Sequence, residues 1–334
     1  MKDPFKIPSE RIVKTPDFNP FLTVFTPTFN RAHTLTDVYE SLCEQTCEDF
    51  EWLIVDDGSS DETRELVKKW ISENRLAIRY QYQENAGKHI AWNHAVQVAQ
   101  GQYFLCLDSD DRFLKETVES IRQLIQNEPE SDKPVSALAF LLMNRKGEPY
   151  GKDLSQLDLR KNYTELTYQA KLPSDIWIVF LLKHLRETLF PETYCNIYFP
   201  ESYLILAYDR RFSISLFTNQ RLGIYQRDVS DLNSLTKVGT IANLNNGSSI
   251  NLAMINLGHL QFCPEMLWKY PKKFLRRAVN YVRFRLHTPD CSSTILREIR
   301  PNSSKIVATL ALPLGLFLYL NDRRKLRRSH PHRH

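Results

Sequence analysis

The amino-acid sequence predicts an α/β fold built on a doubly wound, mainly parallel sheet. Three apolar segments are typical of buried strands, at residues 21–25, 51–55 and 103–107, and a fourth strand is expected at 78–83. Segments with a helical spacing of apolar residues separate them, and such alternation favours parallel strands joined by helices. Polar and acidic residues follow three of these strands directly, which indicates a binding site at one edge of the sheet.

Three helices are predicted between these strands, because apolar residues recur there three and four positions apart. The residues with this spacing are Leu35, Val38, Tyr39 and Leu42 in the first helix, Leu66, Val67, Trp70 and Ile71 in the second, and Ile90, Ala91, Ala95 and Val98 in the third. A capping pattern at Thr34 and Asp37 is expected to open the first helix. Gly101 is expected to stop the third.

The strongest functional signal is the acidic cluster Asp108, Asp110 and Asp111, which follows the apolar run 103–107. Like carboxylates repel one another, and a hard divalent cation such as Mg²⁺ would offset that repulsion. If the acidic cluster is considered alone, a solvated loop with a helix N-cap explains it equally well. In a sheet of strand order 3-2-1-4, however, the ends of strands 1, 2 and 4 meet in one crevice. The cluster is therefore expected to lie beside residues 26–31 and 56–59.

Four motifs carry a resemblance to a known family: PTFNRAHTL at 27–35, FEWLIVDDGSSDET at 50–63, NAGKHIAWNHAV at 85–96 and FLCLDSDD at 104–111. Together they resemble the family-2 inverting glycosyltransferases, which have a GT-A type fold with a mixed sheet. The resemblance implies a nucleotide-sugar donor, usually UDP-linked, a bound Mn²⁺ or Mg²⁺, and a saccharide or lipid-linked acceptor. It implies transfer of a hexosyl or N-acetylhexosaminyl group in surface polysaccharide or glycoconjugate synthesis.

The resemblance also assigns donor-site residues by position. The donor-binding positions that it implies are Thr26, Pro27, Phe29, Asp56, Asp57, Lys88, Asp108 and Ser109. Asp56 or Asp57 matches the acid that hydrogen-bonds the uracil, and an ordinary solvated lysine is the alternative for Lys88. Asp110 would bind the metal directly, with Asp108 facing the ribose and the metal. Asp111 remains a further possible metal ligand.

An inverting transfer also requires a catalytic base, because a carboxylate must accept the proton of the acceptor hydroxyl. By position the resemblance points to Glu201, with Asp175 as the second candidate. An acid that only stabilises a helix N-terminus is the alternative for Glu201. The acceptor half departs from the family pattern at Ile176 and Ala207, which leaves an unusual acceptor or a loss of activity open.

Two other classes of protein compete with this interpretation. A nucleotidyltransferase would also place metal-bound carboxylates beside a nucleotide, but it would normally have a Gly-rich, basic loop after the first strand. A catalytically impaired scaffold that binds sugar-nucleotides is the second rival. The spacings of a P-loop and of a dinucleotide-binding GxGxxG turn are both absent.

We expect an N-terminal arm at 1–19, a glycosyltransferase domain at 20–230 and a helical, basic extension at 231–334. The donor half of the domain is expected at about 20–125 and the acceptor half at about 126–230. The net charge of the whole chain is +5, but residues 266–334 hold sixteen basic and three acidic residues, which leaves −8 for the rest.

The basic extension suggests peripheral contact with an anionic membrane. Residues 274–287 form an amphipathic helical pattern, and residues 306–320 are uncharged. Fifteen residues interrupted by Pro313 and Gly315 are fewer than the roughly twenty that a spanning helix needs, so an interfacial segment with a polybasic anchor is expected. A packed helix with a solvated basic tail is the alternative. Nothing resembles a nucleic-acid recognition fold.

The start of the chain and its cysteines bear on the cellular compartment. No apolar signal peptide is visible in the first ten residues, and the six cysteines show no paired framework. The protein is therefore expected at the cytosolic face of the membrane.

Overall fold

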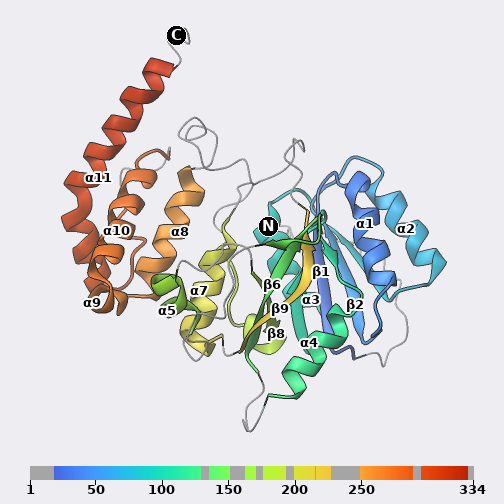
Figure 1. Ribbon diagram of the computed structural model, residues 1–334. Helices are drawn as coiled ribbons and strands as arrows, with labels where there is room; N and C mark the ends of the chain where they lie inside the picture. Colours follow the sequence, from blue (N-terminus) through green and yellow to red (C-terminus); the bar gives the residue numbers. More distant parts are fainter. Residues whose placement is uncertain are drawn as a thin grey trace, which may run out of the picture. The chain divides into compact units, whose positions relative to one another are not determined.

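The structure is a computed structural model that describes residues 19–128, 135–150, 162–170, 176–192, 199–214, 216–226, 249–288 and 295–329. The chain divides into two compact units. The first unit comprises Met1–Asn196 and Phe212–Arg227, and the second comprises Ile197–Arg211 and Asp228–His334. Figure 1 shows the helices and strands of both. The predicted domain bounds of 20–230 and 231–334 stay a prediction, and this division differs from them because it assigns the described residues 199–211 to the second unit.

The first unit contains a mixed sheet of strand order β3-β2-β1-β4-β8-β6-β9-β5, with β7 paired to β6. The strands are β1 Leu22–Thr28, β2 Phe50–Asp56, β3 Ile78–Tyr82, β4 Tyr103–Cys106, β5 Arg112–Phe113, β6 Ala137–Asn144, β7 Pro149–Tyr150, β8 Trp177–Leu181 and β9 Leu216–Tyr225. The strands β3, β2, β1 and β4 are parallel, while β8 pairs antiparallel with both β4 and β6. The predicted order 3-2-1-4 is confirmed.

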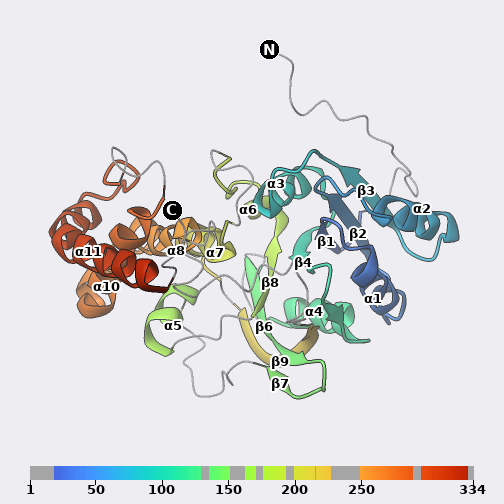
Figure 2. The ribbon, with the colours of Figure 1, turned by 90° about the horizontal axis from the view of Figure 1, so that it is seen from above.

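Helices cover both faces of the parallel part of the sheet, with α3 on one face and α1 and α4 on the other (Figure 2). The helices of the first unit are α1 Ala32–Cys43, α2 Thr63–Glu73, α3 Lys88–Val98, α4 Thr117–Gln126, α5 Tyr163–Ala170 and α6 Leu182–Leu185. Every residue of β1 and β2 is buried, because helices cover both faces, and this explains their nearly continuous apolar sequence.

Aromatic side chains fill the space on both sides of the central strands. On one face the ring of Trp52 from β2 lies 6.2 Å from that of Tyr39 and 5.8 Å from that of Trp70. On the other face the ring of Phe25 from β1 lies 5.8 Å from that of Trp92 on α3. Such aromatic pairs stabilise the fold beyond the effect of apolar burial, and they help to fix the strands relative to the helices.

Two local predictions need correction. The helix α1 begins at Ala32 rather than after Thr34, and the Thr34 hydroxyl donates to the Arg31 carbonyl at 3.3 Å. The helix α3 ends at Val98, so Gly101 is not its cap. A Cβ at Gly101 would lie 2.4 Å from the backbone nitrogen of Thr23, so the glycine permits close packing against β1.

The regular secondary-structure elements among the described residues of the second unit are all helices. These helices are α7 Glu201–Phe212, α8 Ser249–Phe262, α9 Met266–Lys269, α10 Pro271–Arg285 and α11 Asn302–Ser329. The last residue of α7, Phe212, is assigned to the first unit. Within this unit α10 lies between α8 and α11 (Figure 1). The ring of Tyr203 on α7 packs edge-on against Phe262 of α8, with 5.0 Å between the ring centroids.

The expected interruption of the apolar segment at Pro313 and Gly315 is wrong. The helix α11 runs through both residues and is 28 residues long. Its part Asn302–Leu326 is long and apolar enough to cross a membrane, with a mean hydropathy of 1.6 and 28% of its most apolar window buried. A core helix of a soluble protein can have the same length and composition.

Candidate functional site

Three carboxylates meet directly after β4. One oxygen from each of Asp108, Asp110 and Asp111 lies within 4.8 Å of the other two. Burial raises the pKa of Asp110, and the charge of Asp108 raises it further, while Arg31 and Lys88 oppose the shift. The loop therefore concentrates negative charge that a bound cation would stabilise.

Asp111 differs from the other two carboxylates because it is almost completely buried. Its side chain accepts a hydrogen bond from the backbone nitrogen of Gln226 at 2.8 Å. Burial raises its pKa well above the ordinary value, and the charges of Asp108 and Asp110 act in the same direction. Asp111 thus ties the acidic loop to the residue that follows β9, and Asp108 and Asp110 are the more accessible carboxylates.

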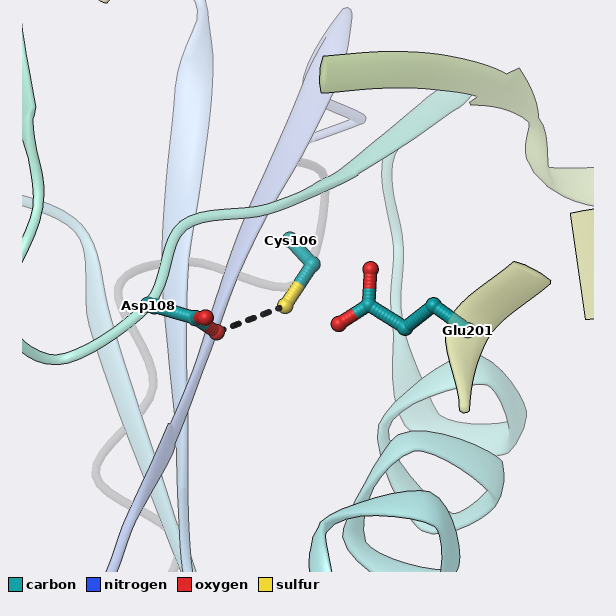
Figure 3. Close-up of side chains that lie close together, drawn as sticks. All are labelled: Cys106, Asp108 and Glu201. Atoms are coloured by element: carbon teal, nitrogen blue, oxygen red, sulfur yellow. Dashed lines mark hydrogen bonds between the residues drawn. The ribbon is translucent and has the colours of Figure 1, made fainter. Parts of the chain in front are cut away.

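Lys88 brings a positive charge to this loop. It is the first residue of α3, and its Nζ lies 2.6 Å from Oδ1 of Asp108. The thiol of Cys106 donates to the same oxygen at 3.6 Å (Figure 3). Cys106 is half-buried at the end of β4. Figure 3 also shows Glu201, the first residue of α7 in the second unit.

Asp57 holds the loop that leads into Lys88. Its carboxylate accepts hydrogen bonds from Gln83 Nε2 at 2.7 Å, from the Ala86 nitrogen at 2.9 Å and from the Gly87 nitrogen at 2.8 Å. Burial raises its pKa, and these hydrogen bonds oppose the shift. Gly87 has a φ of 102°, which favours glycine, and the next residue begins α3. Asp57 therefore positions the backbone from which Lys88 projects.

Asp56 stabilises the turn that follows β2. Its carboxylate accepts from the Tyr80 hydroxyl at 2.6 Å and from the Ser59 nitrogen at 2.8 Å. Burial raises the pKa of Tyr80, and the hydrogen bond to Asp56 raises it further. The turn is joined to the end of β1, because the Asn30 nitrogen donates to Ser59 Oγ at 2.8 Å. These bonds keep the tips of β1 and β2 together.

The residues predicted at the tip of β1 differ in exposure. The side chain of Thr26 is fully buried, and its hydroxyl accepts from the indole nitrogen of Trp52 at 2.9 Å. Thr26 therefore supports the strand through its side chain, and its place in the loop beside the donor base stays a prediction. Pro27 and Ser109 are also buried, whereas Phe29 is 40% exposed. Of these four side chains, Phe29 is the one most available to a ligand.

The structure describes one of the two candidate bases. Glu201 is half-buried at the start of α7. Asp175 lies outside the described residues. Sequence reasoning missed Arg31, whose positive charge opposes the rise in the pKa of Asp110, and it missed Gln226. Arg31 could have been found, because it lies three residues after the end of β1 in a motif already singled out.

The donor atoms of this site fit a hard divalent cation. Asp108 and Asp110 offer carboxylate oxygens on a half-buried loop, and such oxygens are the ligands that Mg²⁺ and Mn²⁺ prefer. Burial, and then the charge of Asp108, raise the pKa of Asp110, and a bound cation would favour its ionised form. Lys88 and Arg31 add basic groups that suit a diphosphate beside the cation.

Residues 23–148 match the family described as "Glycosyl transferase family 2". The fold and the site therefore define this part of the chain as a family-2 glycosyltransferase domain. TuaG of Bacillus subtilis (strain 168), named for teichuronic acid biosynthesis, is 31% identical over 137 residues, 41% of this chain and 53% of TuaG. The poly(ribitol-phosphate) beta-N-acetylglucosaminyltransferase TarS of Staphylococcus aureus (strain MW2) is 30% identical over 200 residues, 59% of this chain and 32% of TarS.

A solved structure shares the fold over most of its length. The crystal structure of S. aureus TarS residues 1–349 in complex with UDP-GlcNAc aligns with a TM-score of 0.57 and covers 92% of both chains. The sequence identity of that alignment is 15%, so the likeness concerns the fold. It confirms the predicted GT-A type architecture. The sequence matches themselves span about half of TuaG and a third of TarS.

Proposed function

We propose that this protein is a metal-dependent, inverting glycosyltransferase that uses a UDP-sugar and acts in cell-surface polysaccharide synthesis. The acceptor would be a saccharide or a lipid-linked saccharide, and the transferred group a hexosyl or N-acetylhexosaminyl unit. The observation that carries the proposal is the meeting of Asp108, Asp110 and Lys88 beside the ends of β1 and β2. Relatives named for teichuronic acid and poly(ribitol-phosphate) chemistry support it.

In this proposal Asp108 and Asp110 hold Mn²⁺ or Mg²⁺. When bound, that cation would neutralise charge that develops on the departing diphosphate. Lys88 is near enough to move from Asp108 to a phosphate oxygen, since its Nζ lies 2.6 Å from the carboxylate. Asp111 keeps the loop attached to Gln226, and Asp57 keeps Lys88 in position. The exposed ring of Phe29 is available to contact the nucleotide.

The transfer itself is a single displacement at the anomeric carbon. The acceptor oxygen forms a bond to that carbon while the bond to the diphosphate breaks, and UDP leaves with the electron pair. A carboxylate accepts the proton of the acceptor hydroxyl. We propose Glu201 as this base and Asp175 as the second candidate, because both follow the metal-binding loop in the part of the chain that the family uses for the acceptor.

The proposal is tested by measuring UDP release and sugar transfer with a panel of UDP-sugars, in Mn²⁺, in Mg²⁺ and in EDTA. We expect turnover with one or a few UDP-sugars and none in EDTA. Undiminished turnover in EDTA would contradict the proposed metal dependence. Release of pyrophosphate from a nucleoside triphosphate and a sugar phosphate would identify a nucleotidyltransferase. Tight UDP-sugar binding without transfer to any saccharide acceptor would identify a scaffold.

A further inference from the structure

The helix α11 packs against its own unit through its small residues. Ser304, Ala308, Ala311 and Gly315 are buried and lie three or four positions apart, so they share one face of the helix. A Cβ at Gly315 would lie 2.5 Å from Cγ1 of Val282 on α10. The two helices therefore approach so closely that a larger side chain does not fit.

The opposite face of α11 exposes large apolar side chains, which we call the apolar face. Its exposed fractions range from 46% to 73%, for Ile306, Leu310, Leu314, Leu316, Phe317 and Leu320. A helix on the surface of a soluble domain normally has the reverse arrangement, with large apolar residues toward the core. A contiguous apolar surface of this kind marks an interaction site.

A buried ion pair fixes this orientation of α11. Asp322 is 2% exposed, and its carboxylate accepts from Arg283 Nε at 2.6 Å and from Arg283 Nη2 at 2.7 Å. His287 Nε2 lies 3.3 Å from the same carboxylate. Rotating α11 to bury its leucines would expose Asp322 and press larger residues against Val282. The outward direction of the apolar face is therefore built into the packing of the unit.

The exposed charge around the apolar face is basic. Glu265, Glu298 and Asp322 are the acidic residues of the described stretches 249–288 and 295–329, and each forms an ion pair with an arginine. The exposed basic side chains on α10 and α11 include Lys272, Lys273, Arg276, Arg323, Arg324 and Lys325. Arg323, Arg324 and Lys325 directly follow the apolar face on the same helix. An anionic surface complements this distribution.

We propose that the apolar face of α11 docks on an anionic lipid bilayer and inserts into the boundary between headgroups and acyl chains. Residues 323–325 then contact lipid phosphates. The helix lies along the surface rather than across the bilayer, because α10 packs along it and carries Lys272, Lys273 and Arg276. Crossing would take those charges and the Arg283–Asp322 pair into hydrocarbon, which is costly. This inference concerns the second unit alone and does not depend on the proposed transfer reaction.

A second copy of this chain is the main alternative occupant. Two copies that met through the apolar face would bring two basic units together, and like charges across an interface oppose association. An anionic membrane supplies both the apolar phase and the opposite charge. The lipid surface is therefore the occupant that matches both properties of the face.

The test is co-sedimentation of the full chain with phosphatidylcholine vesicles and with mixed phosphatidylcholine–phosphatidylglycerol vesicles, at low and at high salt. We expect binding to the mixed vesicles that weakens with salt. The double variant Leu310→Ser/Phe317→Ser is expected to weaken it about tenfold or more, since apolar area no longer enters the bilayer. Arg323→Gln/Arg324→Gln is expected to weaken it about tenfold, mainly at low salt. The matched control is Leu189→Ser, at an exposed leucine of the first unit, and it should bind like the wild type.

Thermal unfolding and light scattering accompany each binding measurement. If the double variant unfolds without cooperativity, Leu314→Ser and Phe317→Ser replace it as single variants with the same expectation. Equal binding to neutral and mixed vesicles, or wild-type binding by the variants of Leu310, Leu314 and Phe317, would overturn the proposal. Self-association that these substitutions abolish, without any vesicle binding, would assign the face to a second copy.

Discussion

Lys88 Nζ and Asp108 Oδ1 lie 2.6 Å apart, although the two residues belong to different elements. Lys88 begins α3, and Asp108 follows β4. The pair places a cation and an anion at the point where the proposed mechanism requires a metal and a diphosphate. Because Asp108 is 41% exposed in its side chain, its partner can be exchanged when a ligand arrives. Lys88 would then contact a phosphate, and Asp108 would contact the metal.

Replacing Asp110 with asparagine should abolish metal-dependent turnover while the protein stays folded. The substitution removes one charged ligand from a hard-cation site, so we expect kcat/KM to fall about 100-fold or more. The measurement is UDP release across a Mn²⁺ titration. Glu116→Gln, at an exposed acid at the start of α4, is the control and should behave like the wild type. Full activity of the Asp110 variant would end the assignment of Asp110 as a metal ligand.

Replacing Lys88 with alanine should weaken UDP binding. If the ammonium group contacts the diphosphate, its loss should raise the Kd of UDP about tenfold, as expected for a charge-assisted hydrogen bond. Isothermal titration calorimetry with UDP and Mn²⁺ measures the change. The exposed Lys115, changed to alanine, is the control. An unchanged Kd would mean that Lys88 serves only to neutralise Asp108.

Glu201→Gln separates donor binding from transfer. A positioned base typically contributes about 100-fold or more, so transfer should slow by that factor while the Kd of UDP-sugar stays near the wild-type value. Single-turnover transfer and equilibrium binding provide the two readouts. Asp175→Asn is the parallel variant and is expected to transfer at a rate closer to that of the wild type. The reverse result for the two variants would exchange the assignments.

Gly58→Ala should disturb the loop that carries Lys88. Gly58 has a φ of 90°, and a Cβ there would lie 2.8 Å from the backbone nitrogen of Asn85. Gly147→Ala is a matched control, because its φ is 74° but nothing lies within 4 Å of the added carbon. We expect Gly147→Ala to reduce the free energy of unfolding by about 1 kcal/mol. Gly58→Ala should reduce it by more and also weaken UDP binding, and equal effects would contradict the steric explanation.

Asp322→Asn should destabilise the second unit and free α11 from α10. Burial alone would raise the pKa of Asp322, but hydrogen bonds and charge from Arg283, with a smaller contribution from His287, hold it below the ordinary value. Loss of a charged hydrogen-bonded pair should cost about 2 kcal/mol at neutral pH. The control Glu265→Gln removes a more exposed pair with Arg210 and should cost less than about 1 kcal/mol.

The pH dependence of this pair has a definite sign. A lowered pKa means that the ionised form of Asp322 is favoured by folding, so its stabilisation is present above the unfolded value of about 3.9. It is lost as the pH falls from there through the lower folded pKa. Denaturant unfolding of wild type and Asp322→Asn should therefore differ at pH 7 and converge in strong acid. A difference that persists in strong acid would indicate a packing effect.

Local sequence patterns determined the order of strands and helices and the place of the site. The runs at β1, β2 and β4 are apolar on both faces because helices cover both sides of a parallel sheet. The carboxyl ends of parallel neighbours share one edge, so the motif with the aspartates had to meet the two others. These features depend on residues close together in sequence, which is why they could be predicted.

Only the tertiary structure decided which residues at this edge are accessible and how α11 is oriented. Asp111 differs from Asp110 because a residue 115 positions away, Gln226, binds it, and local sequence carries no signal of that contact. Thr26 is buried because Trp52 from the next strand reaches its hydroxyl. Likewise, the apolar composition of α11 predicted either a helix packed on the domain or a segment in contact with a membrane. Close contact at Gly315 and the anchoring of Asp322 determined that its large side chains face outward, because helix rotation depends on packing between distant segments.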